Sequence, residues 1–529
     1  MSLSNVSRRN LLKLGAATAL AHSAPRLSFA QSKSRVIRAV MHTSLRVTDP
    51  LVVPAWTTRN HGYNIYDTLF SMDSKLNYKP QMVDSFEVSG DGLTYTFRLR
   101  SGLKFHDSAP VTSEDVIASL KRWGSRDPMG ISLLAATGEL IAVDAQTFRL
   151  VLKRPFGHVL AALGKPSSAV PFIMPARIAA TPPTQQITEF VGSGPFRFVP
   201  GEFKPGVKAV YERNADYVPR QEAADGLAGG KVVKVDRYEW ITIPDFQTSF
   251  NALVNNEIDY FENPTHDMLP NAEKAGLKMF DYNPAGFTGY CRANWLSPLM
   301  AKQEIRQAIF HAVNQQDWLD AQVGDPKYYK VSAAMFMPGM TYASEAGWST
   351  KADPAATKTL LAKAGYKGEP ITLLQVSDAP IISPLVDVTA QAMRQAGMNV
   401  KLAAMDWLSV LARRAKQESG EQGGWDLMHA TQAAVDVFNP IINQHLIAVG
   451  KSGTFGWVDD KPLVDLRQSF IDETDPAKQK AIAETIQKRA YEVVTHVPTG
   501  VFKQPALHRP GLTGLLPALV PVFWNVEKA

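Results

Sequence analysis

The feature that most constrains the fold is an alternation of helix and strand patterns that begins after residue 290. Segment 303–319 repeats apolar residues at helical spacing, and segments 353–366 and 475–494 each open with Asp-Pro, a common helix start. Between them, the run DVTAQAMRQAGMNVKLAAM predicts a helix that ends at Gly397 and a strand that follows. Because helices that alternate with strands build layered domains, this region is predicted to be an α/β domain.

The region between about residues 67 and 190 has a different pattern. Residues 93–99 alternate apolar with polar, which predicts a half-buried strand, and Gly90-Asp91-Gly92 before them predicts the turn of a hairpin. Thr112, with Asp115 three residues later, predicts the N-cap of a helix that continues to Trp123. This region is therefore expected to be rich in hairpins.

The length and charge of the chain limit the class of protein to which it can belong. A chain of 529 residues is too long for one core, so at least two domains are expected. The net charge of +6 comes largely from four basic residues among the first 30, which hold no acid. Without them, 52 basic residues stand against 50 acidic ones, so a nucleic-acid partner is not expected.

The first 30 residues are typical of a cleavable export signal. A basic start is followed by an apolar run and by Ser28-Phe29-Ala30, which suits cleavage near Ala30. The segment SRRNLLK, beginning at Ser7, resembles the twin-arginine export motif, whose substrates fold before export. Cys291 is the single cysteine, so neither a disulfide nor a lipid-anchored cysteine is expected, and the mature protein is predicted to be periplasmic. The apolar stretch 515–524 predicts a buried strand and turn, since it is short and holds two prolines.

No familiar catalytic set is present in the sequence. It has no P-loop, no nucleophile elbow, no HExxH and no CxxC, and its eleven histidines never pair at helical spacing. We therefore expect no enzyme activity, no metal site and no cofactor. Catalysis at a site of unfamiliar type remains an alternative interpretation. A large exported protein without reactive groups suits capture of a ligand between two lobes.

Several segments carry a family resemblance. The stretch from Ile65 to Trp123, which contains IYDTLF, DGLTYTFRLRSGLKFHD and VTSEDV, resembles the family 5 extracellular solute-binding proteins of ABC importers. Further matches are VGSGPFRF, NNEIDYF, EIRQAIFHAVNQQDW and DPAATKTLLAKAGY, which occur in family order between about residues 35 and 505. Ser108 and Ser113 depart from the family pattern, which usually has Gly and Ala there.

The resemblance implies an α/β, two-lobed periplasmic-binding-protein fold of the class C (type II) kind. After a signal peptide at 1–30, lobe one would comprise 32–66, 190–285 and 498–529, with an extra hairpin-rich domain inserted at 67–189. Lobe two would comprise 286–497. The chain would cross between lobes near 283–290 and 495–500, and Asn283-Pro284-Ala285-Gly286 suits a hinge.

The resemblance also implies capture without catalysis. The protein would be a monomer that closes on a peptide or peptide-like amine and passes it to an inner-membrane ABC permease, whose separate ATPase supplies the energy. Other ligands known in the family leave an alternative open, namely a nickel chelate, haem, an opine or a sugar derivative.

Asp436 is the leading site candidate. In peptide-binding members, an Asp four residues before a Pro pairs with the α-amino group of the ligand, and Asp436 stands four residues before Pro440. The otherwise apolar neighbourhood of Asp436 also suggests a carboxylate that must pair with something. The plain alternative is an Asp that caps a turn near Pro440.

Two departures from the family bear on specificity. Peptide binders often carry Trp three residues before this Asp, where the present chain has Ala433. Dipeptide binders use an Arg in the loop that corresponds to 377–384, and that loop has none here. Strict dipeptide specificity is therefore not expected.

The family positions imply further ligand-binding candidates on both lobes. Trp56 lies in a loop expected to approach the ligand, and Glu262 and Asn263 follow the NNEIDYF strand. Tyr290 lies just past the first crossover and Phe438 lies beside Asp436. For each aromatic residue, packing in the core or at the hinge is the alternative.

Overall fold

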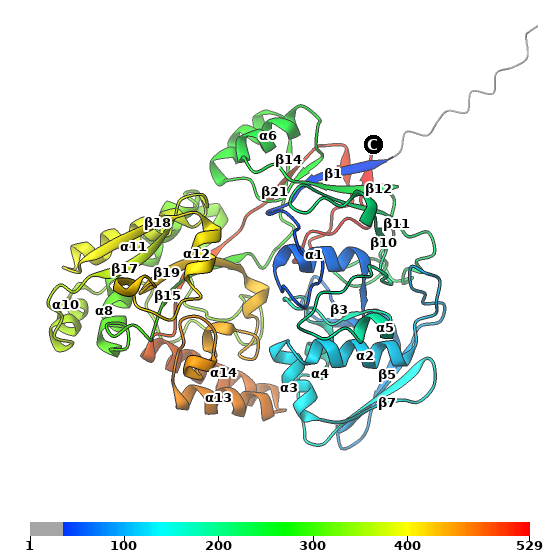
Figure 1. Ribbon diagram of the computed structural model, residues 1–529, viewed down its shortest axis with the longest axis horizontal. Helices are drawn as coiled ribbons and strands as arrows, with labels where there is room; N and C mark the ends of the chain where they lie inside the picture. Colours follow the sequence, from blue (N-terminus) through cyan, green and yellow to red (C-terminus); the bar gives the residue numbers. More distant parts are fainter. Residues whose placement is uncertain (1–34) are drawn as a thin grey trace, which may run out of the picture. The chain divides into compact units, whose positions relative to one another are not determined.

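A computed structural model describes residues 35–529, and these form a two-lobed α/β molecule (Figure 1). The predicted twin-arginine signal lies outside the described residues. We call the part built on a seven-stranded sheet, together with the region that holds a four-stranded sheet, the first lobe. The part built on a six-stranded sheet is the second lobe. In residues 35–529, no helix combines the length and apolar character needed to span a bilayer.

The seven-stranded sheet of the first lobe is mixed. In spatial order its strands are β10 (Phe196–Phe198), β11 (Lys208–Arg213), β12 (Arg237–Ile241), β1 (Val36–Val40), β13 (Tyr260–Phe261), β21 (Ala506–His508) and β14 (Lys278–Phe280). Strand β1 runs parallel to both β12 and β13, and the other pairs are antiparallel. The helices of this part are α1 (Trp56–Ile65), α6 (Phe246–Val254) and α7 (Leu269–Lys274).

The predicted hairpin region forms an antiparallel four-stranded sheet. Its strands, in spatial order, are β5 (Val83–Val88), β6 (Thr94–Leu99), β8 (Thr147–Leu152) and β7 (Thr137–Ala142). Phe97 and Leu99 are buried while Arg98 is exposed, which is the alternation that the sequence predicted. The region also holds α2 (Ser113–Gly124), α3 (Pro128–Ala136), α4 (Val159–Gly164), α5 (Ala176–Ala179), β2 (Asp67–Thr68), β3 (Phe70–Met72), β4 (Tyr78–Pro80) and β9 (Phe172–Ile173).

Helix α2 begins where the sequence predicted. The Thr112 hydroxyl accepts from the Asp115 backbone N–H, and the Asp115 carboxylate accepts from the Thr112 N–H at 2.8 Å. This reciprocal capping satisfies two of the free amides of the first turn.

The six-stranded sheet organises the second lobe. Its strands, in spatial order, are β16 (Tyr329–Lys330), β20 (Val497–Phe502), β15 (Phe287–Ala293), β19 (Leu427–Ala433), β17 (Ile371–Val376) and β18 (Val400–Met405). The helices are α8 (Gln303–Ala312), α9 (Gln315–Gln322), α10 (Pro354–Lys363), α11 (Ser383–Gln395), α12 (Trp407–Arg413), α13 (Lys461–Asp472) and α14 (Pro476–Val493). Asp353 and Asp475 cap α10 and α14, as their Asp-Pro starts predicted.

The single helix predicted over 303–319 is wrong, because the chain forms two helices there. Val313 and Asn314 have extended backbone, so α8 ends at Ala312 and α9 starts at Gln315. The buried Gln315 amide bonds the backbone N–H and C=O of Ser332 and the C=O of Pro498, which fixes the break. A β-branched residue followed by Asn also favours a break over a continuous helix.

The two crossings between the sheets lie side by side. Residues 281–286 lead from β14 into β15, and Gly286 has a φ of +74°. A Cβ on Gly286 would lie 2.6 Å from the carbonyl oxygen of Phe502, so a larger residue would push the crossings apart. Strand β20 reaches Phe502 within the six-stranded sheet, so the return crossing follows Phe502 rather than lying at 495–500.

The C-terminal segment 515–524 is partly as predicted. Its second half, Ala518–Trp524, is buried, but none of 515–524 is strand. Because it carries Pro517 and Pro521, the segment lacks two of the N–H donors that a sheet would need. It connects the two strands of a short antiparallel ladder, β22 (Leu512–Thr513) and β23 (Glu527–Lys528).

Candidate functional site

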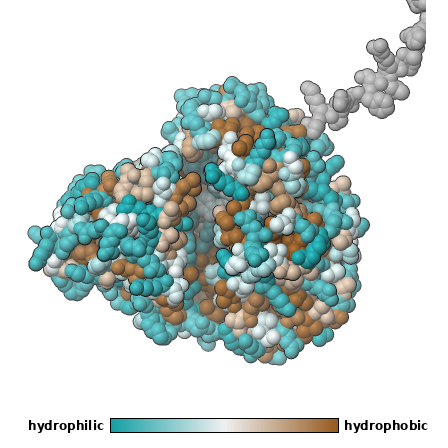
Figure 2. All heavy atoms as spheres, viewed as in Figure 1, coloured by the Kyte–Doolittle hydropathy of each residue, from teal (hydrophilic) through white to brown (hydrophobic). Residues whose placement is uncertain are grey.

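A groove separates the two lobes on the face shown in Figure 2. Asp436 comes from the second lobe, in a short 3₁₀ helix (Ala434–Val437) that directly follows β19. The N–H of Ala434 donates to the carbonyl of Gly286 at 3.0 Å, which ties this turn to the first crossing. The Asp436 side chain keeps 19% of its surface exposed although its neighbours Ala434, Val435 and Val437 are buried.

Two hydrogen-bond donors and one nearby cation from the first lobe surround the Asp436 carboxylate. The indole Nε1 of Trp56 donates to Oδ2 at 2.7 Å, and the backbone N–H of Ser168 donates to Oδ1 at 3.3 Å. Nη1 of Arg59 lies 3.9 Å from Oδ1. All three partners are hundreds of residues away in the sequence, so Asp436 joins the two lobes across the groove.

Arg59 reaches Asp436 from within α1. Its side chain is 4% exposed, and its Nε donates to the Asn60 side chain at 3.2 Å. Nη1 also contacts the Pro166 carbonyl at 3.5 Å, a long hydrogen bond. The guanidinium is therefore held in place by the first lobe and turned toward the carboxylate of the second.

A second carboxylate, Glu262, lies close to this group. Its Oε2 accepts from the His42 backbone N–H at 2.8 Å and lies 3.0 Å from His42 Nδ1. Burial alone would raise the pKa of Glu262, but the charge and hydrogen bonds of His42, together with the charge of Arg59, hold it below its usual value. Glu262 is therefore ionised at neutral pH.

Asn263 and Glu262 share one partner. The Tyr282 hydroxyl lies 3.3 Å from Glu262 Oε1 and 3.2 Å from Asn263 Oδ1. Asn263 is half-buried, whereas Glu262 is 2% exposed. The structure therefore brings these two predicted residues together and leaves Asn263 the more accessible of the pair.

Trp56 is the first residue of α1 rather than part of a loop. Its ring packs against Phe287 with centroids 5.4 Å apart and against His42 at 5.5 Å. Ala433, where the family often has Trp, is buried. The aromatic group beside Asp436 thus comes from the opposite lobe.

Tyr290 and Phe438 lie in the interior of the second lobe. Phe438 is 1% exposed, and Tyr290 is 3% exposed with its ring 4.2 Å from that of His445. Burial raises the pKa of Tyr290, which therefore keeps its proton. In this conformation both side chains are almost inaccessible to solvent, and their ligand-binding roles stay predictions.

Sequence reasoning missed three neighbours of the site, namely Arg59, Ser168 and His42. Arg59 gives a weak signal, since it is a basic residue inside the helix that opens beside the predicted Trp56. Ser168 contributes a backbone N–H, which any residue type could supply, and His42 is one scattered histidine among eleven.

Comparisons with known proteins agree with this architecture. The chain is 38% identical over 533 residues to a protein from Sinorhizobium fredii (strain NBRC 101917 / NGR234), with 99% of this chain and all of the relative covered. That relative is named "Probable peptide ABC transporter periplasmic-binding protein y4tO".

Two solved structures show the same fold at low identity. A dipeptide-binding protein from Pseudoalteromonas sp. SM9913, in complex with Met-Leu, gives a TM-score of 0.78 at 18% identity, covering 94% of this chain and 100% of that one. The periplasmic binding protein DppA from Helicobacter pylori, in complex with the peptide STSA, gives 0.77 at 21% identity, covering 93% and 98%.

The sequence model for bacterial extracellular solute-binding proteins, family 5 Middle, matches residues 77–440, which is more than half of the chain. This match spans both the hairpin region and the strand that leads to Asp436. The S. fredii relative extends the agreement over nearly the whole length. The chain belongs to the bacterial extracellular solute-binding proteins of family 5.

Proposed function

We propose that this protein captures peptides or peptide-like amines in the groove and delivers them to an inner-membrane ABC permease served by a separate ATPase. The main observation in support of the proposal is the set of charged side chains around Asp436. Two carboxylates, Asp436 and Glu262, face one permanently charged group, Arg59. A ligand ammonium would place a second positive charge, beside that of Arg59, next to these two carboxylates.

The Asp436 carboxylate also has room for another donor. An ionised carboxylate offers about four acceptor sites. Oδ2 accepts from Trp56 and Oδ1 accepts from Ser168, while Arg59 at 3.9 Å is beyond a good hydrogen bond. An ammonium bonded here in a closed groove would contribute about 1.5–3 kcal/mol of net binding free energy.

The names of similar proteins support the same ligand class. The S. fredii relative is named as a probable peptide-binding component, and the two structural neighbours hold Met-Leu and the peptide STSA. A nickel chelate, haem, an opine or a sugar derivative is the alternative ligand, and the partly exposed Asp436 carboxylate favours an amine over an acidic opine or an uncharged sugar.

Capture would work by closure about the paired crossings. The lobes would be 32–66, 190–285 and 498–529, with 67–189 inserted, against 286–497, with the return boundary moved to follow Phe502. A ligand held by both walls of the groove binds the closed form better than the open one, so it shifts the balance toward closure.

The remaining features of the proposal concern the protein's setting. Its leader would take it through the twin-arginine route to the periplasm with cleavage near Ala30 and no lipid anchor. We propose that the mature protein acts as a monomer, binds no nucleic acid and does not transform its ligand.

Native mass spectrometry of protein purified from its own periplasm tests the ligand class. A bound mass that corresponds to a peptide or another primary amine supports the proposal. A bound haem, metal chelate or uncharged sugar would establish the alternative, and a substrate mass that shifts to a product mass on incubation would show an enzyme.

Titration calorimetry then tests the anchor with the peptide identified. Asp436→Asn should weaken binding by more than tenfold, and N-acetylation of the peptide should weaken wild-type binding by a similar factor. Asp472→Asn is the matched control, because that carboxylate lies on α13 and is 47% exposed. Unchanged affinity in Asp436→Asn would place the anchor elsewhere.

A further inference from the structure

Arg292 is a buried arginine with unused donors. It lies in β15 and is 0% exposed, yet its Nε and Nη2 have no hydrogen-bond partner among residues 35–529. It forms no ion pair with any carboxylate in this part of the chain. A buried charge of this kind costs several kcal/mol unless something outside the chain neutralises it.

The single partner of the Arg292 guanidinium is uncharged. Nη1 lies 3.1 Å from Nδ1 of His445, and His445 Nε2 lies 3.1 Å from the Gln432 side-chain oxygen. Burial, with the charges of His496 and Arg292, holds the pKa of His445 well below its usual value, so the ring is neutral. Nδ1 therefore accepts from Arg292 and Nε2 donates to Gln432, and neither contact balances the guanidinium charge.

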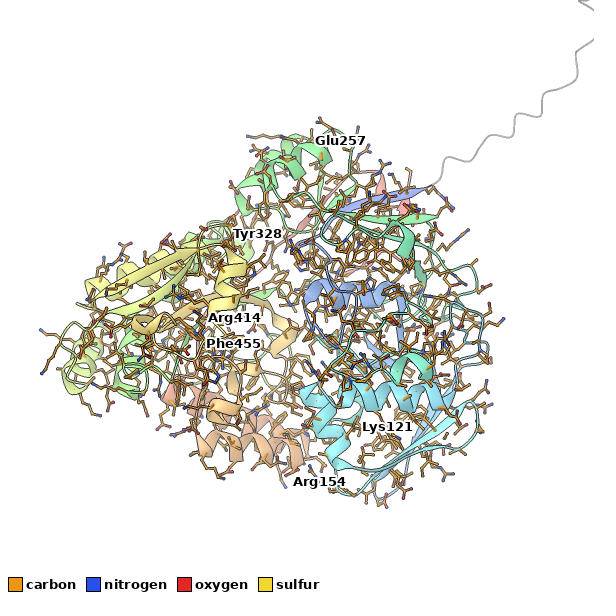
Figure 3. The ribbon with its side chains drawn as sticks, viewed as in Figure 1. Lys121, Arg154, Glu257, Tyr328, Arg414 and Phe455 are labelled. Carbon is orange, nitrogen blue, oxygen red and sulfur yellow. The ribbon has the colours of Figure 1, made fainter. Side chains whose placement is uncertain are left out.

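A second arginine, Arg414, lies near the first. Its guanidinium carbon is 4.2 Å from the centre of the Phe455 ring, and that of Arg292 is 5.5 Å from the same ring. Arg414 is half-buried and forms no ion pair in the described part of the chain. Figure 3 labels Arg414 and Phe455 together on the flank of the second lobe that faces the first lobe.

Arg306, another buried arginine of the second lobe, has a structural role and serves as a comparison for Arg292. Arg306 is 3% exposed and also stacks on an aromatic ring, that of Trp295, at 3.4 Å. Each of its three nitrogens donates to backbone carbonyls, those of Met300, Ala301 and Val493. Arg306 is therefore fully satisfied by the chain, whereas Arg292 is not.

The turn from Thr454 to Trp457 packs against Arg292, with the Phe455 ring on the guanidinium and Gly456 beside Nε. Trp457 N–H donates to the Thr454 carbonyl at 2.9 Å, and Gly456 in this turn has a φ of +97°. A Cβ on Gly456 would lie 2.4 Å from Arg292 Nε. Glycine at this position therefore lets the turn approach the unused Nε donor closely, where a larger residue would clash.

We propose that Arg292 and Arg414 form an anion subsite on the second lobe, which takes a carboxylate of the ligand whose ammonium pairs with Asp436. The binding of the ligand's ammonium at Asp436 rests on the proposed function. The binding of its carboxylate rests on the two arginines. A planar carboxylate matches the paired N–H groups of a guanidinium, and Arg414 is more exposed than Arg292.

The strand register gives the length of such a ligand. Arg292 pairs with Met428 on β19, and the turn that carries Asp436 begins after Ala433. At about 3.3 Å per residue this distance along the strand is about 17 Å. An extended peptide of at most about five residues spans this distance.

A first experiment uses sulfate alone and needs no peptide. The melting temperature of the mature protein is measured with millimolar sodium sulfate and with sodium chloride at equal ionic strength. Sulfate should raise the melting temperature of wild type and of the exposed control Arg149→Met, but not that of Arg292→Met, with a reduced effect in Arg414→Gln. Equal sulfate responses in wild type and Arg292→Met would overturn the subsite.

The Arg292→Met variant should fold. Replacing an uncompensated buried charge with an apolar side chain of similar length is neutral or stabilising, so its melting temperature in chloride should match or exceed that of wild type. Arg292→Lys serves as a second variant that keeps the charge and loses the planar pair of donors, and it should give an intermediate sulfate response.

A second experiment compares tetraalanine with its C-terminal amide by calorimetry. Wild type should bind the free acid at least tenfold more tightly, and Arg292→Met should bind both equally. Equal binding of acid and amide by wild type overturns the subsite and leaves amine capture standing. If neither peptide binds while the sulfate response still depends on Arg292, peptide capture fails and the anion subsite stands.

Discussion

The two lobes treat buried charge differently. In the first lobe, Lys231 Nζ lies 2.7 Å from Asp67 Oδ1 and Arg122 Nη2 lies 2.8 Å from Asp49 Oδ2, and all four side chains are at most 3% exposed. In the second lobe, Asp436 finds its donors in the opposite lobe, and the buried Arg292 has no acidic partner among the described residues.

This difference suggests that the first lobe is mainly a stable scaffold and that the groove side of the second lobe is mainly a binding surface. The first lobe completes these two charge pairs within itself, whereas its buried Arg59 meets a carboxylate only across the groove. The groove side of the second lobe is completed by closure through Asp436 and, as proposed, by an anion at Arg292. Substitutions in the first lobe should therefore reduce stability, and those on the groove side of the second lobe should mainly change closure and affinity.

The largest effect is expected from breaking a buried pair in the first lobe. Lys231→Met leaves the Asp67 carboxylate buried without its cation, and only donors such as the Tyr217 hydroxyl at 2.8 Å remain. The free energy of unfolding should fall by about 3–5 kcal/mol in urea titrations followed by circular dichroism. Arg292→Met should lose less than about 1 kcal/mol by the same measurement. Similar losses in both variants would remove the contrast between the lobes.

A smaller effect is expected at the contact across the groove. Trp56→Phe keeps an aromatic ring against Phe287 and removes the N–H that Asp436 accepts. A hydrogen bond to a charged group contributes about 1.5–3 kcal/mol, so the open fraction of ligand-free protein should rise at least tenfold. Small-angle X-ray scattering would detect it as a larger radius of gyration. Trp240→Phe is the control, since the buried Trp240 Nε1 makes no hydrogen bond within residues 35–529, and the same expansion there would contradict the role of Trp56.

Acid should weaken closure at the rim of the groove. His158 precedes α4 in the first lobe and stacks on Phe470 of α13 in the second, with ring centroids 4.9 Å apart. Burial lowers the pKa of His158 more than its hydrogen bond to the Phe470 carbonyl raises it, so the closed form holds it neutral. Opening exposes the ring and returns its pKa toward 6.5.

The sign of the pH effect follows from that lowered pKa. Below about pH 6.5 the open form binds a proton that the closed form does not, and closure loses up to about 1.4 kcal/mol per pH unit. Scattering at pH 5.5 should therefore show more open protein than at pH 7.5. His158→Gln should remove this dependence, and a pH response that persists in the variant would assign it to another group.

The smallest effect is expected from the exposed ion pair at the same rim. Arg154 pairs with Asp472, and their side chains are 35% and 47% exposed. Solvent screening limits such a pair to about 0–1 kcal/mol, so Arg154→Ala should leave the melting temperature and the open fraction within error. A shift as large as that of Trp56→Phe would show that surface charge, rather than the Asp436 contact, holds the lobes together.

Much of the local structure could be predicted from the sequence. The hairpin strand Thr94–Leu99, the Thr112 cap and the Asp-Pro helix starts depend on residues within a few positions of each other. The break after Ala312 could not be predicted, because Gln315 is held by Ser332 and Pro498, which only the fold brings near. The missing strand in 515–524 likewise depends on what that segment packs against.

The site could be predicted in part. Apolar neighbours marked Asp436 as a carboxylate in need of a partner, and the family pattern pointed to Trp56, which does contact it. Arg59 and Ser168 were not predicted, since their approach to Asp436 depends on how the lobes meet. Arg292 was also missed, because its unused donors are a property of packing rather than of spacing.

A crystal structure with the peptide that co-purifies from the periplasm tests the central claim most directly. Our account predicts closed lobes with the ligand ammonium within hydrogen-bonding distance of the Asp436 carboxylate, in addition to Trp56 and Ser168. A closed complex in which Asp436 keeps only its present partners, with the ligand's amine bound elsewhere, would contradict it.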